Sequence, residues 1–290
     1  MPNNTYTNNN LLAPDQIAEQ TVQNGYKKAN TKVSRLFVLG ILAGAFIAFA
    51  SEGSNAAIYN IPWAGVGKAL AGALFTTGLM LVIVAGSELF TGNTLMVAAL
   101  AQRKITLRGM LKNWVTVYSG NFVGALLIAW LIYLSGQLDF TDGLLGGFTI
   151  KTAAYKVSLG FSKAFVMGIL CNWLVSLAVW MAYGSKDMAG RLLAIFFPIW
   201  LFITSGFEHC VANMYYIPAG ILAKSNPEWV KQAISLGATA DKINHLTWSS
   251  FFTNNLIPVT LGNIVGGVVF TGMAYWFVYL FRKDSKPVIK

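Results

Sequence analysis

The hydropathy pattern divides this chain into long apolar stretches separated by short polar gaps. A helix needs about 20 consecutive apolar residues to cross a hydrocarbon core about 30 Å thick. Six regions are long and apolar enough, and they predict an all-α polytopic membrane protein with six transmembrane helices. The regions are 34–51, 64–102, 110–135, 161–184, 188–223 and 249–281.

Composition agrees with this fold class. Charged residues make up 11% of the 290 residues and hydrophobic residues 55%, whereas soluble domains carry about 25% charged residues. The net charge of +10 comes from basic residues in the polar gaps, so we expect a lipid bilayer and no nucleic acid as partner. Cys171 and Cys210 match no metal-binding spacing, and the chain has two histidines. We therefore predict no metal site and no cofactor.

The polar ends of the chain are expected to lie outside the membrane. Residues 1–33 form a polar segment in which Pro14 starts a short helix and Gly25 ends it, and this helix is expected to lie against the protein. Residues 34–281 form the transmembrane pore domain, and 282–290 form a basic tail.

Lysine and arginine indicate the orientation of the chain. They concentrate in the N-terminal segment, in the gaps after the second and fourth regions, and in the tail. Cytoplasmic loops of membrane proteins carry such an excess of positive charge. The pattern predicts a multi-pass protein of the inner (plasma) membrane with both termini in the cytoplasm.

Two of the six regions are predicted to contain broken helices. Regions 64–102 and 188–223 are too long for one span, and polar residues interrupt them at 86–93 and 205–213. Both interruptions read Glu-x4-Asn, namely Glu88 to Asn93 and Glu208 to Asn213. Non-helical chain at membrane depth occurs only inside protein or along a water-filled path.

The segments around these interruptions form a repeat. Residues 113–124 and 255–266 both read Asn-x6-Gly-Asn-x2-Gly, and Gly-Ile-Leu begins at Gly40 and at Gly168. Each repeat, about 34–135 and 161–281, holds three spans, so the halves lie oppositely in the membrane. Inverted repeats with discontinuous helices place a transport site at the repeat interface, and half-helix N-termini favour an anion there.

Three ionisable residues lie in apolar surroundings, where such groups mark functional sites. Glu88 and Glu208 have a structural alternative, which is to accept hydrogen bonds from free backbone N–H groups at the breaks; Asn93 is grouped with Glu88 in this role. His209 could change its charge near neutral pH. We expect a functional role for it, because it interrupts a helix rather than capping one.

Motifs at 86–93, 112–121, 206–214 and 255–263 resemble those of the formate/nitrite transporter family, over residues 11–282. The resemblance implies an aquaporin-like six-helix protomer in a homopentamer, with one pore per protomer. Family members move formate, nitrite or hydrosulfide, by passive or proton-coupled permeation. From the residues themselves we predict no enzyme, because a membrane enzyme would need a nucleophile–base pair or metal ligands at depth and this chain has one intramembrane histidine with no cluster.

The resemblance also implies roles for individual residues. Thr91 and His209 would form a central pair in the pore that relays protons. Lys156 would attract anions near the outer mouth, held by Glu208, Asn213 and Asn172. The hydrophobic constrictions, whose residues would otherwise be assigned to ordinary helix packing, would comprise Phe75, Leu79, Leu89, Val175 and Phe202.

The substrate is predicted less directly. Residues 206–209 and 255–260 resemble formate members, whereas 86–92 and 170–175 resemble nitrite members. We favour formate, with nitrite or hydrosulfide as the alternative. An aquaporin-like channel for neutral solutes is more remote, since it would carry Asn-Pro-Ala in each break, where this chain reads Phe-Thr-Gly-Asn and Cys-Val-Ala-Asn.

Overall fold

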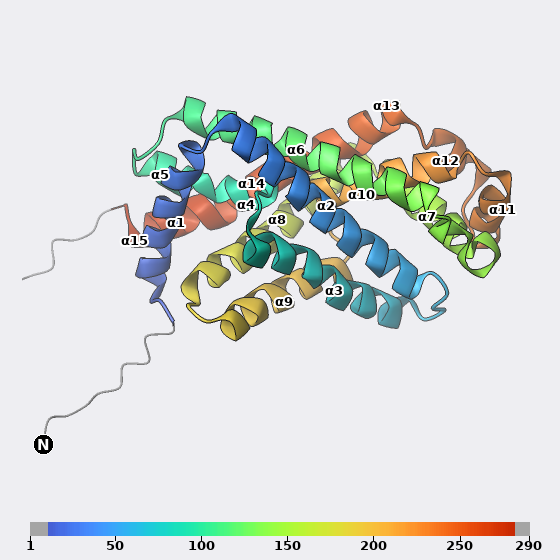
Figure 1. Ribbon diagram of the computed structural model, residues 1–290, viewed down its shortest axis with the longest axis horizontal. Helices are drawn as coiled ribbons and strands as arrows, with labels where there is room; N and C mark the ends of the chain where they lie inside the picture. The colour runs from blue at the N-terminus through green and yellow to red at the C-terminus, as the bar shows by residue number, and fades with distance from the viewer. Residues whose placement is uncertain (1–10, 282–290) are drawn as a thin grey trace, which may run out of the picture.

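The computed structural model describes residues 11–281, which form helices joined by short turns (Figure 1). Among these residues, five helical stretches are long and apolar enough to cross a membrane: Val33–Ile58, Ala64–Gly86, Leu107–Leu134, Phe161–Gly184 and Trp248–Tyr279. The first half of the chain contains α1 (Pro14–Ala29), α2 (Val33–Ile58), α3 (Ala64–Leu81), η1 (Val82–Gly86), α4 (Phe90–Asn93), η2 (Thr94–Met96), α5 (Val97–Ala101), α6 (Leu107–Leu134), η3 (Gln137–Asp139) and α7 (Phe140–Val157). The second half contains α8 (Phe161–Gly184), α9 (Met188–Thr204), α10 (Cys210–Ala223), α11 (Pro227–Ser235), α12 (Ala240–His245), α13 (Trp248–Ser250), η4 (Phe251–Leu256), α14 (Ile257–Gly267), η5 (Val268–Met273) and α15 (Ala274–Tyr279).

The all-α prediction is confirmed, but some predicted boundaries are wrong. The first span continues to Ile58 rather than ending at 51, which brings Glu52 and Asn55 inside the buried part of α2. The predicted break in the region 188–223 is confirmed, since it separates α9 from α10, and each of these helices is shorter than a full span. Helices α7, α11 and α12 occupy stretches that the hydropathy pattern left without helices.

The N-terminal helix is also longer than predicted. It begins at Pro14 as expected, but it continues through Gly25 to Ala29. Gly25 is buried, and a Cβ there would lie 2.7 Å from the Cβ of Ala99 in α5. This glycine permits close packing of α1 on the protein instead of ending the helix. The expectation that α1 lies against the protein is confirmed.

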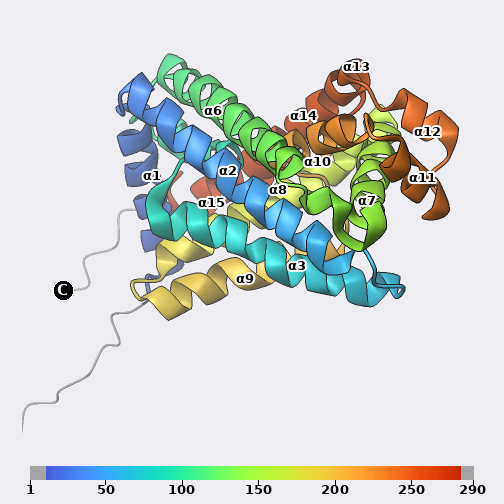
Figure 2. The same ribbon diagram turned by 45° about the vertical axis from the view of Figure 1, so that its right-hand side comes forward.

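Both ends of the described chain lie on the same side of the helix bundle. Lys112 at the start of α6 donates to the carbonyl of Ala29, and Gln102 after α5 donates to the carbonyl of Leu280. We call this side, which carries α1 and the end of α15, the terminal side, and the opposite side, with α11, α12 and the α2–α3 connection, the far side (Figures 1 and 2). The basic tail 282–290 lies outside the described residues.

Glycines allow two equivalent pairs of helices to cross in close contact. A Cβ on Gly120 of α6 would lie 2.6 Å from the carbonyl oxygen of Phe37 in α2. A Cβ on Gly168 of α8 would lie 2.8 Å from the carbonyl oxygen of Val259 in α14. Larger side chains would separate these backbones, as the packing rule for small residues in membranes predicts.

Each of the two predicted breaks is stabilised by one buried asparagine. Gly86 and Gly206 take the left-handed conformation, with φ of 83° and 73°, and turn the chain out of the helix. Asn121 then accepts a hydrogen bond from Phe90 N and donates to the carbonyls of Gly40 and Glu88. Its side chain thereby pairs with two backbone groups at the break, Phe90 N and the carbonyl of Glu88, and ties the break to α2 through Gly40.

Asn263 repeats this arrangement in the second half. It accepts from Cys210 N and donates to the carbonyls of Gly168 and Glu208. The backbone N–H of Glu88 donates to Leu39, and that of Glu208 donates to Met167. The internal repeat seen in the sequence is therefore a repeat of hydrogen-bonding geometry.

We expect Asn121→Ala to lower thermal stability markedly. The change leaves two backbone groups at the break, Phe90 N and the carbonyl of Glu88, without this partner, and each unpaired buried group costs about 1–3 kcal/mol. The midpoint of thermal unfolding of the detergent-solubilised protein measures the effect. Asn60→Ala, at an exposed position, is the matched control. Equal midpoints for the two variants would contradict this role of Asn121.

Candidate functional site

The two breaks meet through a hydrogen bond between Thr91 and His209. Thr91 lies in the first turn of α4, and His209 immediately precedes α10. The Oγ1 of Thr91 lies 3.0 Å from the Nε2 of His209, and both side chains are buried. The N-termini of two half-helices therefore converge on one polar pair, where their free N–H groups and dipoles favour negative charge.

His209 caps α10, contrary to the prediction that it only interrupts a helix. Its Nδ1 accepts a hydrogen bond from the N–H of Ala212 at 3.1 Å. An accepting Nδ1 carries no proton, so the neutral ring has its proton on Nε2, which points to Thr91. A second proton on Nδ1 would break the bond to Ala212. Protonation of His209 is thus coupled to the geometry of the helix end.

The apolar residues implied by the family resemblance are all buried. Phe202 stacks on the His209 ring at 6.0 Å between ring centroids, and Phe75 packs edge-on against Phe202 at 5.7 Å. Leu79, Leu89 and Val175 lie in the same hydrophobic cluster. One aromatic ring therefore covers a face of the histidine, and a second supports that ring.

Lys156 forms a buried ion pair on the far side of the central pair. It belongs to α7, and its Nζ lies 2.8 Å from Oε1 of Glu208. Asn213 donates to Oε2 of Glu208 and to Asn255, while Asn255 donates to the carbonyl of Lys156. The carboxylate is held by side-chain donors, so the hypothesis that it accepts from free backbone N–H groups is wrong.

Asn172 is not a partner of Lys156. Its amide nitrogen donates to the carbonyls of Thr91 and Asn263 and to the hydroxyl of Thr94. It therefore links α4 to α14, behind the central pair. The prediction failed because the position of Asn172 in α8 says nothing about which helix end packs against it.

The terminal side carries an equivalent ion pair that the sequence analysis missed. Lys28 of α1 lies 2.7 Å from Oε2 of Glu88. Asn93 donates to the same oxygen and to Asn113, and Asn113 donates to the carbonyl of Lys28. Lys28 thus occupies in the first repeat the place of Lys156 in the second. The sequence contained a sign of this equivalence, because Lys28 precedes Gly40 by twelve positions and Lys156 precedes Gly168 by the same number.

Lys28 lies outside the membrane-spanning helices, and its environment keeps it charged. Burial lowers the pKa of Lys28, but the adjacent Glu88 carboxylate more than offsets this, so the net pKa lies above the ordinary value of 10.5. Because the pKa is raised in the folded protein, the stability that the pair contributes is fully present below the ordinary pKa of 10.5. This contribution is lost as the pH rises through the raised pKa. The contact therefore persists at neutral pH.

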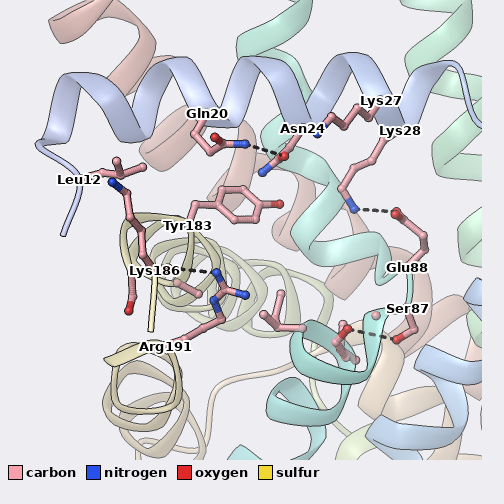
Figure 3. A pocket seen from close by; sticks show the side chains of 15 residues that line it. Leu12, Gln20, Asn24, Lys27, Lys28, Ser87, Glu88, Tyr183, Lys186 and Arg191 are labelled. Atoms are coloured by element: carbon pink, nitrogen blue, oxygen red, sulfur yellow. Dashed lines mark hydrogen bonds and ion pairs between the residues drawn. The ribbon is translucent and has the colours of Figure 1, made fainter. Parts of the chain in front are cut away.

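A cavity of about 570 Å³ opens beside this ion pair on the terminal side. It is lined by α1, by residues 82–88 of the first break and by residues 182–191 (Figure 3). Lys27, Lys28, Lys186 and Arg191 face it, against one carboxylate, Glu88. The excess of positive charge makes it a vestibule suited to small anions.

The family of the chain follows from comparison with known proteins. The formate/nitrite transporter family model matches residues 15–277. The chain belongs to the formate/nitrite transporter family. Formate channel FocA of Escherichia coli (strain K12) is 39% identical over 280 residues, which cover 94% of this chain and 96% of that protein. Formate channel BtFdhC of Bacillus thuringiensis is 38% identical over 270 residues, covering 92% and 95%.

Solved structures of relatives share the fold. A pentameric formate channel with formate bound superposes with a TM-score of 0.76 at 36% identity, covering 89% of this chain and 98% of the other. An FNT family ion channel gives a TM-score of 0.77 at 29% identity, covering 91% and 98%. The transporter fold and the multi-pass membrane assignment predicted from the sequence are thereby confirmed.

Lys28→Met is expected to release α1 from the protein. Removing one partner of a fully buried ion pair costs about 3–5 kcal/mol, because the remaining charge is left uncompensated, and for this partly buried pair we expect a smaller cost of the same sign. Hydrogen–deuterium exchange of residues 14–29 should rise, while exchange in α6 stays unchanged. Lys27→Met changes an exposed lysine one residue earlier on the same helix and should leave exchange in α1 as in the wild type. Wild-type protection of α1 in Lys28→Met would show that other contacts hold the helix.

Proposed function

We propose that this protein conducts formate across the inner membrane, as a homopentamer with one pathway in each protomer. The observation that carries the proposal is the Thr91–His209 contact, which brings two half-helix N-termini together at the repeat interface. The similar proteins named as formate channels, and the pentameric structure with formate bound, support both the substrate and the assembly. The terminal side faces the cytoplasm in this proposal, in keeping with the basic residues gathered there.

Charge explains how an anion reaches the centre. Moving a carboxylate from water into a medium of low dielectric costs of order 20 kcal/mol before protein groups offset it. Lys156 on the far side and Lys28 on the terminal side place a cation at each approach, and each is balanced by one glutamate. In this proposal the pairs attract formate, and on the terminal side Lys27, Lys186 and Arg191 add further positive charge.

The central pair then supplies hydrogen bonds where hydration is lost. The Nε2–H of His209 and the hydroxyl of Thr91 are donors suited to the two formate oxygens. Phe75, Phe202, Leu79, Leu89 and Val175 exclude water around this point and so strengthen these bonds. The imidazole takes up a second proton only by giving up its bond to Ala212, and we assign to this step the proton linkage of transport.

We expect Lys156→Met to reduce formate flux strongly. The change removes the far-side cation and leaves Glu208 unpaired, which repels an approaching anion. Salt screens exposed charges, but the Lys156 side chain is 13% exposed and Glu208 2%, so high salt should restore little of the flux. Conductance in planar bilayers, with formate, nitrite, hydrosulfide and chloride compared, measures both the effect and the substrate preference.

Lys231→Met is the control for this experiment. Lys231 also lies on the far side, but its side chain is 71% exposed and pairs with Glu228 on the protein surface. It should conduct as the wild type does. A Lys156→Met channel that conducts formate at the wild-type rate would remove Lys156 from the pathway, and formation of a chemical product from formate would indicate an enzyme.

His209→Asn tests the central pair. Asparagine is a favourable N-cap residue, so its Oδ1 can replace Nδ1 as acceptor for Ala212 while its amide remains a donor toward Thr91. It does not take up a proton near neutral pH. We therefore expect the variant to retain formate conductance and to lose proton-linked formate uptake, measured with a pH-sensitive dye inside vesicles. Uptake of formate together with protons at the wild-type rate would leave His209 only a structural role.

A further inference from the structure

A second ionisable group lies buried in the transmembrane region, away from the central pair. Glu52 belongs to α2 and is 3% exposed. It lies six residues before the far-side end of the helix at Ile58, roughly 9 Å along the axis. No lysine or arginine in the described part of the chain forms an ion pair with it. A carboxyl group in such a place requires a physical explanation.

The hydrogen bonding around Glu52 is incomplete. The hydroxyl of Tyr215 in α10 donates to Oε2 of Glu52 at 2.5 Å. The other oxygen, Oε1, is buried without a partner, and so is the amide nitrogen Nδ2 of Asn55. Glu52 and Asn55 are three residues apart and therefore neighbours on one face of α2. An unused acceptor and an unused donor thus lie close together in the protein interior.

This arrangement suits two protonation states of one carboxyl group. The neutral acid needs few partners, and the single bond from Tyr215 suits it. The ionised carboxylate needs several donors, because a buried charge without them costs far more than a buried neutral group. Asn55, on the same face of α2, has a free N–H group of the kind that Oε1 would then need. The site therefore contains a donor that the neutral acid does not use and that the ionised form requires.

The surroundings connect Glu52 with the far-side approach. Tyr216 follows Tyr215 in α10, and the two rings lie 5.9 Å apart. The Nζ of Lys156 lies 5.2 Å from the centre of the Tyr216 ring, and Lys156 pairs with Glu208. The titratable groups that face Glu52 are thus Tyr215 and Tyr216 from α10, with Lys156 of α7 and its partner Glu208, which lies just before α10, beyond them. Among the described residues, no ionisable side chain of α3 or α6 bonds to Glu52.

We propose that Glu52, with Asn55 and Tyr215, forms a proton-binding site on the far side of each protomer that sets the dependence of formate transport on far-side pH. The proposal rests on the function proposed above. Protonation removes a negative charge near the anion approach, and ionisation restores it. Formate should therefore enter faster from an acidic far side than from an alkaline one, independently of the proton step at His209.

The test combines infrared spectroscopy with transport. In pH difference spectra of the protein reconstituted in liposomes, the wild type should show a C=O band of a protonated carboxyl group that disappears as the pH rises. Glu52→Gln should lack this band, because the amide keeps the acceptor for Tyr215 but carries no titrating proton. Tyr215→Phe should shift the band, because it removes the one hydrogen bond to the carboxyl group. Glu228→Gln, an exposed glutamate on the same side, should leave the band unchanged.

Transport then shows whether the proton matters. In the wild type and in Glu228→Gln, formate uptake should differ between acidic and near-neutral external pH. Part of this difference should survive in His209→Asn. Glu52→Gln should lose that part. An absent band, or a band that does not change with pH, overturns the proposal, as does a Glu52→Gln variant with the wild-type pH dependence. If Glu52→Gln does not fold, the wild-type band and its shift in Tyr215→Phe decide. A wild type that moves no formate refutes the proposed function, while the band still tests the proton site.

Discussion

Two stretches of non-helical chain inside a membrane impose the constraint on which the structure depends. Each unpaired backbone group in hydrocarbon costs several kcal/mol, so the breaks persist only where side chains satisfy them. Asn121 and Asn263 meet this requirement, each with one accepted and two donated hydrogen bonds. Both asparagines lie on helices that cross a neighbour in close contact through glycines, which brings the amides within reach of the breaks.

The same constraint creates the functional site. Because both half-helices end inside the protein, their N-termini meet, and Thr91 and His209 come within hydrogen-bond distance although 118 positions separate them. Around this centre the repeat places Lys28 with Glu88 on one side and Lys156 with Glu208 on the other. Buried ion pairs contribute little net stability compared with apolar packing. Their presence in both halves fits a role in anion attraction better than a role in folding.

The two proton sites proposed above differ in geometry. His209 is held by a helix end, so a change in its protonation disturbs the N-terminus of α10. Glu52 lies on the side of a continuous helix and has one strong partner, and the donor Asn55 beside it is unused. Together the two sites would allow the centre and the far-side approach of one protomer to respond to pH separately.

The sequence by itself determined the features that depend on local pattern. Hydropathy and charge identified the membrane class, and polar interruptions at 86–93 and 205–213 located the breaks. The Asn-x6-Gly-Asn-x2-Gly motif showed the internal repeat, although the role of its second asparagine at each break came only from the structure, and the family motifs pointed to Thr91 and His209 as a pair. These inferences succeed because the requirement for apolar surface and for backbone partners acts on each segment of chain separately.

Only the tertiary structure decided which buried polar groups meet. Asn172 binds Thr91 and Asn263 rather than Lys156, Lys28 reaches Glu88 from a helix outside the predicted spans, and Glu52 lies inside a span predicted to end before it. The partner of a buried side chain depends on which helix crosses at that depth and at what rotation. That information resides in the packing of distant segments, and hydropathy along the chain does not contain it.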